Sequence, residues 1–293
     1  MDGWGVPMVW LDHDAYLEQS HKRCAFNLYA IAALTHALAP IARHLGDERC
    51  ADGALEFGAS LLRRTRAMYW DEARGVFSAQ PVSAASPDSR SRLCDRSLAT
   101  AVLYGQCLDD RTRPSLELLA SPPPELGLSY PANAVWRMRA LIHGGQIQPV
   151  LRELRERWAT MPSVQLNHTL SEFWHAIPDT DHQWSHCAAA PLIAAYTGIA
   201  GLQPLEPGYR RARLRPQLGD LTRLQCTSRT PHGELRLEAQ GEFGGREITV
   251  DVPPAVTLEL EVSPRERLSL PQIDDHRYLL PPGRTTAITL TDT

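Results

Sequence analysis

The 293-residue sequence lacks a paired-cysteine pattern, because its six cysteines are scattered and no two of them form a CxxC pair. Disulfide frameworks are dense and belong to small domains, so we expect these thiols to be reduced and mostly buried. The first residues also lack a basic and an apolar leader segment, and no run of about 18 apolar residues is present to cross a bilayer. These absences predict a cytoplasmic protein without a membrane partner.

An excess of charge is missing as well. The formal net charge is −4, which gives no general attraction to nucleic acid or to anionic membranes. The phosphate-binding pattern GxxxxGK[ST] and the nucleophile elbow GxSxG are both absent. Four arginines at positions 210, 211, 213 and 215 lie near strand alternation, and we interpret them as a solvated strand face. A neutral, polar partner such as a sugar fits this composition better.

The spacing of apolar residues changes near residue 203. Before it, apolar residues recur with the period of a helix. The pattern predicts helices over residues 25–38 (ending at Pro40), 51–68, 97–108, 132–143, 147–158 and 187–200. Short loops between paired helices are typical of αα-hairpins. The first part of the chain is therefore predicted to be mainly α, built as a toroid of helical hairpins.

After residue 203 apolar and polar residues alternate with period two, which is typical of strands with one buried face. The alternating segments are residues 235–239, 248–252, 258–262 and 287–290, separated by turns rich in glycine and proline. Short strands at this spacing predict a small β-sandwich. We expect a helical domain over residues 1–203 and an all-β domain over residues 204–293.

The densest group of unusual residues lies between positions 158 and 187, which hold Trp158, Trp174 and Trp184 of the seven tryptophans. Aromatic faces are surfaces on which sugar rings stack. Glu172 has apolar and aromatic neighbours in the sequence, so desolvation would disfavour its charged form and prepare it for proton transfer. The alternative is that Glu172 is a structural glutamate at a helix cap or on the surface.

A metal site is the rival interpretation of this group. His182 and His186 have the spacing that places two ligands on one helix face. No glutamate follows His182, so the HExxH pattern of zinc peptidases fails. Asp179 and Asp181 lack the glycine and the spaced carboxylates of a calcium loop. The sequence predicts neither a metal nor another cofactor.

Several segments, taken in order, resemble bacterial α-L-rhamnosidases, the family of six-hairpin glycosidases numbered 78. The segments are 157–161 (RWATM), 169–174 (TLSEFW), 185–191 (SHCAAAP), 198–209 (GIAGLQPLEPGY), 214–216 (LRP) and 228–233 (SRTPHG). Near the start, 9–12 (VWLD) is similar to the family's Phe-x-Asp-Trp segment, with His13 where a tryptophan is usual. The segment 69–75 (YWDEARG) is similar to its Phe-Trp-Asp-Glu loop.

The resemblance implies an (α/α)6 barrel followed by a β-sandwich, and hydrolysis of terminal α-L-rhamnosides with inversion. By position, Glu172 matches the general base that activates water, and His186 matches a residue of the sugar pocket. Trp174, Trp158 and Asp12 are assigned to substrate binding on the same grounds. The expected partner is a rhamnose-containing oligosaccharide or glycoside.

The second carboxylate of such a site is not assigned. The family's general acid lies in an acidic stretch well upstream of the segment that here holds Asp12, and nothing similar precedes Asp12 in this sequence. About six helices are predicted where a closed barrel has twelve. We therefore expect the C-terminal portion of a longer enzyme.

Four alternatives to that expectation stay open. One is completion of the barrel by another chain or a second copy. Another is a non-catalytic carbohydrate-binding or structural remnant. The third is a different inverting six-hairpin glycosidase, for instance one acting on uronic acids, although no arginine follows Arg157 in the 158–187 group. The fourth is that Asp12 or Asp14 substitutes for the missing acid.

Overall fold

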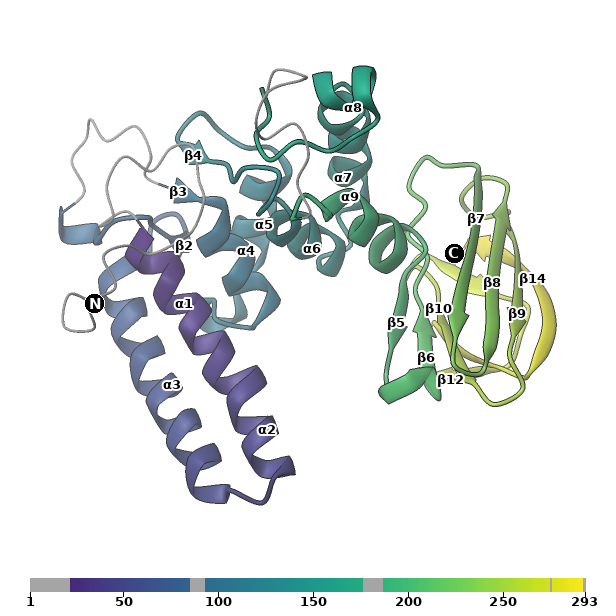
Figure 1. Ribbon diagram of the computed structural model, residues 1–293, viewed down its shortest axis with the longest axis horizontal. Coiled ribbons are helices and arrows are strands. Elements are labelled where there is room, and N and C mark those ends of the chain that lie inside the picture. Colours follow the sequence, from purple (N-terminus) through teal and green to yellow (C-terminus); the bar gives the residue numbers. More distant parts are fainter. Residues whose placement is uncertain (1–21, 85–92, 176–186, 275, 292–293) are drawn as a thin grey trace. The chain divides into compact units, whose positions relative to one another are not determined.

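The computed structural model describes residues 22–84, 93–175, 187–274 and 276–291 (Figure 1). The chain divides into two compact units. The first comprises the described residues up to Pro149 and those from Glu153 to Ala190, and the second comprises Val150–Arg152 and those from Pro191 onward. The first unit is mainly helical and the second is mainly β, as Figure 1 shows.

Short helices and one long hairpin make up the first unit. The α-helices are α1 (Arg23–Ala33), α2 (Ala39–His44), α3 (Glu48–Tyr69), α4 (Asp95–Leu103), α5 (Arg113–Ala120), α6 (Val135–His143), α7 (Ile147–Glu153) and α8 (Pro162–Asn167). Residues 150–152 of α7 belong to the second unit. Two π-helical segments, η3 (Leu34–Leu38) and η6 (Leu154–Trp158), and two 3-10 turns, η4 (Val82–Ala84) and η5 (Leu108–Asp110), join them. Most of the helices predicted from the sequence are present, whereas α5 and α8 were not predicted.

The predicted helix end at Pro40 is wrong, because the chain stays helical to His44. The π-helical segment η3 ends two residues before this proline, at Leu38. Proline breaks a regular α-helix by removing one donor of the i→i−4 ladder, and a π-segment already interrupts that ladder.

Helix α3 packs against α1 and α2 to form the hairpin at the start of the described chain (Figure 1). Small side chains allow the close approach, with Ala39 and Ala42 facing Ala51 and Ala54. The run Arg23–His44 is long and apolar enough to cross a bilayer by length and composition alone. Its buried face packs on α3, and α1 also packs on α4.

Two short strand pairs lie between the helices. Strands β1 (Trp70–Asp71) and β2 (Val76–Phe77) form an antiparallel hairpin. Strands β3 (Leu93–Cys94) and β4 (Leu126–Gly127) pair in parallel, with Cys94 opposite Gly127. Because α4 begins directly after β3, this pairing brings the first turn of α4 beside the residues that follow β4.

The main stretch of the second unit starts at Pro191, inside the short helix α9 (Ala190–Ile193). The π-helical segment η7 (Ala194–Ile199) follows, and then come ten strands and the 3-10 turn η8 (Pro207–Tyr209). The strands are β5 (Leu202–Pro204), β6 (Arg211–Leu214), β7 (Arg223–Thr230), β8 (Gly233–Gln240), β9 (Glu247–Val252), β10 (Thr257–Glu261), β11 (Glu266–Leu268), β12 (Gln272–Asp274), β13 (Arg277–Leu280) and β14 (Gly283–Thr291).

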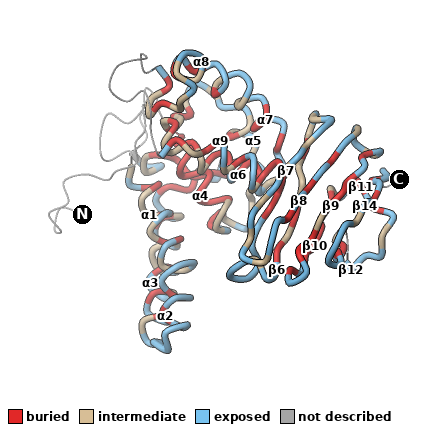
Figure 2. The backbone as a smooth tube through the Cα atoms, turned by 45° about the vertical axis from the view of Figure 1, so that its right-hand side comes forward, coloured by how far each residue is buried: buried red, intermediate tan, exposed pale blue. Residues whose placement is uncertain are grey.

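These strands form two sheets, in the orders β12-β13-β10-β6-β5 and β11-β14-β9-β8-β7. Both sheets contribute to one apolar core, with Leu214, Leu258 and Tyr278 from the first and Leu237 and Val250 from the second. Buried and exposed residues alternate along β8 and in the middle of β14, as the period-two segments predicted, whereas residues 248–252 and 258–262 are buried or half-buried throughout (Figure 2).

A glycine is required where the chain enters the first sheet. Gly201 has a φ of +72°, and a Cβ there would lie 1.9 Å from the carbonyl oxygen of Arg215. The two residues are held together because Arg215 donates its backbone N–H to the Gly201 carbonyl, at 3.0 Å. Any residue with a Cβ at this position would force apart the start of β5 and the end of β6.

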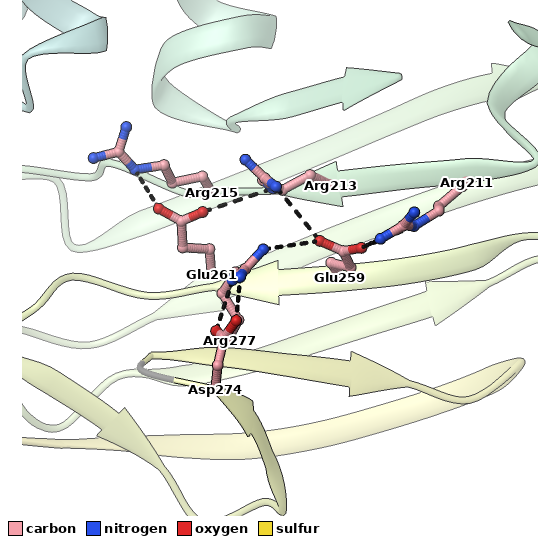
Figure 3. A network of polar contacts seen from close by, with 7 residues as sticks. All are labelled: Arg211, Arg213, Arg215, Glu259, Glu261, Asp274 and Arg277. Carbon is pink, nitrogen blue, oxygen red and sulfur yellow. Dashed lines mark hydrogen bonds and ion pairs between the residues drawn. The ribbon is translucent and has the colours of Figure 1, made fainter. Parts of the chain in front are cut away.

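The arginines of β6 are ion-paired (Figure 3). The Glu259 side chain is only 4% exposed and lies 2.9 Å from Arg211 Nε, 3.5 Å from Arg213 Nη2 and 3.8 Å from Arg277 Nη1. Arg215 Nε lies 3.0 Å from Glu261. The interpretation of a solvated strand face holds, since the side chains of Arg211, Arg213 and Arg215 are 50%, 28% and 33% exposed, but it missed these ion pairs. The reason is the parallel pairing of β6 with β10, which sets Arg213 opposite Glu259.

Candidate functional site

The segment that carries Glu172 is a tight reversal of the chain after α8. The helix ends at His168, whose φ of 56° lies in the left-handed region. Thr169 N then donates to the Ser163 carbonyl at 3.2 Å, and the hydroxyl of Ser171 bonds to that of Ser163. Ser163 and Ser171 are both fully buried. The reversal therefore fixes the backbone immediately before Glu172.

Phe173 and Trp174 fix the backbone on the other side of Glu172. The Phe173 ring meets the ring of Tyr130 edge to face, with centroids 4.8 Å apart and an interplanar angle of 89°. Trp174 is 7% exposed. Glu172 itself is half-buried. Its backbone is therefore anchored through both neighbouring residues.

Trp174 is held from three directions. Its ring packs edge to face on Trp158, with centroids 4.8 Å apart. The guanidinium of Arg157 lies over the same ring, 3.6 Å from its centroid. The indole Nε1 of Trp174 donates to the Ser129 carbonyl at 3.2 Å. A large ring with a cation above it and a satisfied N–H group is a rigid support.

The Ser129 anchor depends on Asp95 at the start of α4. Asp95 is 1% exposed and accepts two hydrogen bonds from Ser129, one from the backbone N–H at 2.8 Å and one from the hydroxyl at 2.9 Å. The parallel pairing of β3 with β4 brings the two residues together. A buried carboxylate thus orients the carbonyl group that receives the Trp174 indole.

A buried ion pair supports Trp158. Its indole Nε1 donates to Glu153 at 3.2 Å, and Glu153 forms a salt bridge with Arg137. The two charged side chains are 8% and 6% exposed, and Arg137 Nη1 also donates to the Leu119 carbonyl at 3.0 Å. Burial lowers the pKa of Arg137 to about 10, while nearby Asp95 raises it and Arg157 lowers it further. The guanidinium stays charged at neutral pH.

The structure brings three of the predicted site residues together, namely Glu172, Trp174 and Trp158. Trp158 is 2% exposed, so both tryptophans of this group offer little surface to a ligand. Asp12 and His186 lie outside the described residues, as do Asp14, Asp179, Asp181 and His182. Within the described ranges, no group of three or more histidine, cysteine, aspartate or glutamate side chains could hold a metal ion.

Sequence reasoning missed the residues that support this segment, namely Asp95, Ser129, Tyr130, Arg137 and Glu153. Their partners lie 34 residues away for Asp95 with Ser129 and 45 residues away for Ser129 with Trp174. One signal was available for part of the network. Arg137 lies in a predicted helix on the face that carries Leu141, where a charged residue needs a buried partner.

The comparisons with known proteins point to one family. Residues 201–274 match the family model described as bacterial alpha-L-rhamnosidase C-terminal domain. A curated alpha-L-rhamnosidase of Streptomyces avermitilis is 36% identical over 66 residues, which are 22% of this chain and 6% of that protein. The resemblance to bacterial α-L-rhamnosidases that the motifs carry is thereby confirmed.

Solved structures extend the likeness to nearly the whole chain. The S. avermitilis alpha-L-rhamnosidase, solved with L-rhamnose, superposes with a TM-score of 0.70 at 19% identity, over 97% of this chain and 28% of that one. A family 78 rhamnosidase of Bacillus sp. GL1 gives 0.67 at 21%, over 83% and 26%. The Aspergillus terreus enzyme gives 0.68 at 17%, over 94% and 31%. The chain thus spans less than a third of each, and the likeness concerns the fold.

Proposed function

From this resemblance we propose that the chain takes part in the hydrolysis of terminal α-L-rhamnosides with inversion, and that Glu172 is the general base. The observation that carries the proposal is the anchored, half-buried Glu172 inside a segment whose motifs follow the rhamnosidase order. The proposed architecture is part of an (α/α)6 toroid followed by a β-sandwich. The proposed substrate is a rhamnose-containing oligosaccharide or glycoside.

The geometry of the Glu172 segment suits a general base. An inverting glycosidase uses one carboxylate to deprotonate a water molecule and one carboxylic acid to protonate the leaving oxygen, at a separation of about 6.5–9.5 Å. A base must be held in a fixed position and must be reachable by water. Ser171 and Trp174 are both anchored, and Glu172 between them is only half-buried. In this proposal Trp174 and Trp158 hold Glu172, while His186 and Asp12 contact the sugar.

The general acid is left unassigned. Of the buried carboxylates in this network, Asp95 is bonded twice by Ser129, and Glu153 is bonded by Arg137 and Trp158. Neither is free to deliver a proton to a leaving group. Because the described residues leave the general acid unassigned, the second candidate is that the chain binds a rhamnoside without hydrolysing it.

The two candidates are separated by measuring turnover and binding on the same protein. We expect the chain to release nitrophenol from para-nitrophenyl α-L-rhamnopyranoside with saturation kinetics, and to bind L-rhamnose in a saturable titration of tryptophan fluorescence. Saturable binding without turnover would select the carbohydrate-binding candidate. Absence of both turnover and binding would contradict both.

A further inference from the structure

A small pocket lies on the outer face of the sheet that contains β7, β8 and β9, and the proposed reaction does not use it. These three strands lie side by side (Figure 1). The pocket has a volume of about 80 Å³, and we call it the sheet-face pocket. Its lining residues are Arg223, Leu224, Gln225, Glu238, Ala239, Gln240, Glu247 and Thr249.

The pairing of the strands sets three polar side chains in one row across the pocket. Arg223 of β7 lies opposite Gln240 of β8, which lies opposite Glu247 of β9. All three are exposed. The guanidinium only donates hydrogen bonds, the carboxylate only accepts them, and the amide does both. The row therefore runs from a donor to an acceptor across three strands.

A second row lies two residues further along each strand. Gln225 lies opposite Glu238, and Glu238 lies opposite Thr249. Because side chains alternate between the two faces of a strand, this row shares its face with the first. Thr249 is only 7% exposed, and its hydroxyl lies 2.9 Å from that of Thr286. The short Thr249 side chain therefore forms the floor of the pocket, between longer side chains.

The five exposed side chains of the two rows are available to a ligand. In the part of the chain that the structure describes, none of them forms a hydrogen bond or an ion pair with another residue. The neighbouring charges on these strands differ, because Arg236 pairs with Glu234, and Arg284 pairs with Asp251. The pocket is thus a stretch of this face where donors and acceptors are not already used within the protein.

The lining argues against three classes of ligand. Two carboxylates and one guanidinium make it negative overall, so an anion would be repelled. Its two apolar residues, Leu224 and Ala239, pack against the core of the unit, so an apolar ligand would find little surface to cover. Among the described residues, no group of three or more histidine, cysteine, aspartate or glutamate side chains could hold a metal ion.

We propose that the sheet-face pocket binds a neutral saccharide through its hydroxyl groups. A hydroxyl group both donates and accepts hydrogen bonds, so several of them can use a lining of mixed donors and acceptors. Neighbouring strands lie about 4.8 Å apart, similar to the width of one sugar ring, so a single ring reaches side chains of two strands. Arg223 and the two glutamines donate to hydroxyl oxygens, and the two glutamates accept from hydroxyl groups. The site does not depend on the role given to Glu172.

The test is an NMR titration of the isotope-labelled whole chain with the methyl glycosides of glucose, galactose and mannose. These neutral sugars differ in the configuration of the hydroxyls at carbons 2 and 4, and none is a rhamnoside. We expect at least one of them to shift the amide signals of residues 223–225, 238–240 and 247–249. The dissociation constant should be on the order of 1 mM, the range that a few net hydrogen bonds allow.

Two outcomes of this titration would overturn the proposal. One is the absence of saturable shifts at these residues with all three glycosides. The other is saturation by methylammonium with no response to the sugars, which would make the two glutamates a site for cations.

Two glutamine variants locate the binding. Gln240→Ala removes the centre of the first row and should weaken sugar binding about fivefold, the effect of one net hydrogen bond. Gln203→Ala is the matched control, since Gln203 is an exposed glutamine in β5 of the other sheet. Equal affinities of these two variants would reject the site. Glu172→Gln should leave the affinity unchanged, so failure of the proposed reaction is distinguishable from failure of this site.

Discussion

Replacing Glu172 with glutamine is expected to lower kcat for para-nitrophenyl α-L-rhamnoside by roughly 10²–10⁴-fold, the usual contribution of a general base. Glutamine keeps the shape of the side chain and its hydrogen-bonding capacity but takes up no proton from water. The anchors on both sides of the residue, Ser171 on Ser163 and Trp174 on Ser129, are unchanged by the substitution. The loss should therefore lie in kcat, with little change in the melting temperature.

Glu156→Gln is the matched control for this prediction. Glu156 is an exposed glutamate in η6, near Glu172 in sequence, and the same chemical change there should leave kcat within about twofold of the original, as surface substitutions usually do. Steady-state kinetics of both variants provide the comparison. Equal activity in the Glu172 and Glu156 variants would remove Glu172 from the reaction.

Glu153→Gln is expected to lower the free energy of unfolding by about 3–5 kcal/mol, because it breaks a buried ion pair and leaves one charge behind. Both side chains are less than a tenth exposed, and the Arg137 guanidinium would remain in the interior without its carboxylate. Glu153 also accepts from the Trp158 indole, whose ring supports Trp174. Urea unfolding followed by tryptophan fluorescence measures the loss.

A double variant tests the cause of that loss. Changing Arg137 and Glu153 together to methionine removes both charges and keeps similar volumes, so it should recover more than half of the lost stability. A double variant no more stable than Glu153→Gln alone would show that the loss came from packing. A single variant within about 0.5 kcal/mol of the original protein would show that the pair contributes little.

The period of the apolar pattern was enough to predict most helices of the first unit and the central strands of the second. It failed where the backbone departs from regular geometry. At Pro40 a π-helical segment removes the conflict that makes proline a helix breaker. Helix α8 has six residues, too few for a period to be visible, yet its reversal positions Glu172.

The residues of the candidate site also include some that the sequence predicts and some that it does not. Glu172 and Trp174 could be chosen from the sequence because their unusual neighbours lie beside them in the chain. Asp95 and Ser129 could not, since the pairing of β3 with β4 brings them together across 34 residues. Charge pairs that depend on strand register were also hidden, as Arg213 with Glu259 illustrates. Candidate site residues can be predicted from their neighbours in the sequence, whereas the residues that hold them in place are known only from tertiary contacts.

The most direct test of the role given to Glu172 is the configuration of the sugar that is released first. Proton NMR during hydrolysis of an α-L-rhamnoside distinguishes the two anomers before they equilibrate. A carboxylate that activates water delivers it to the face opposite the leaving group, so the account predicts β-L-rhamnose as the first product. Early accumulation of α-L-rhamnose would require retention through a covalent intermediate, and would contradict Glu172 as a general base.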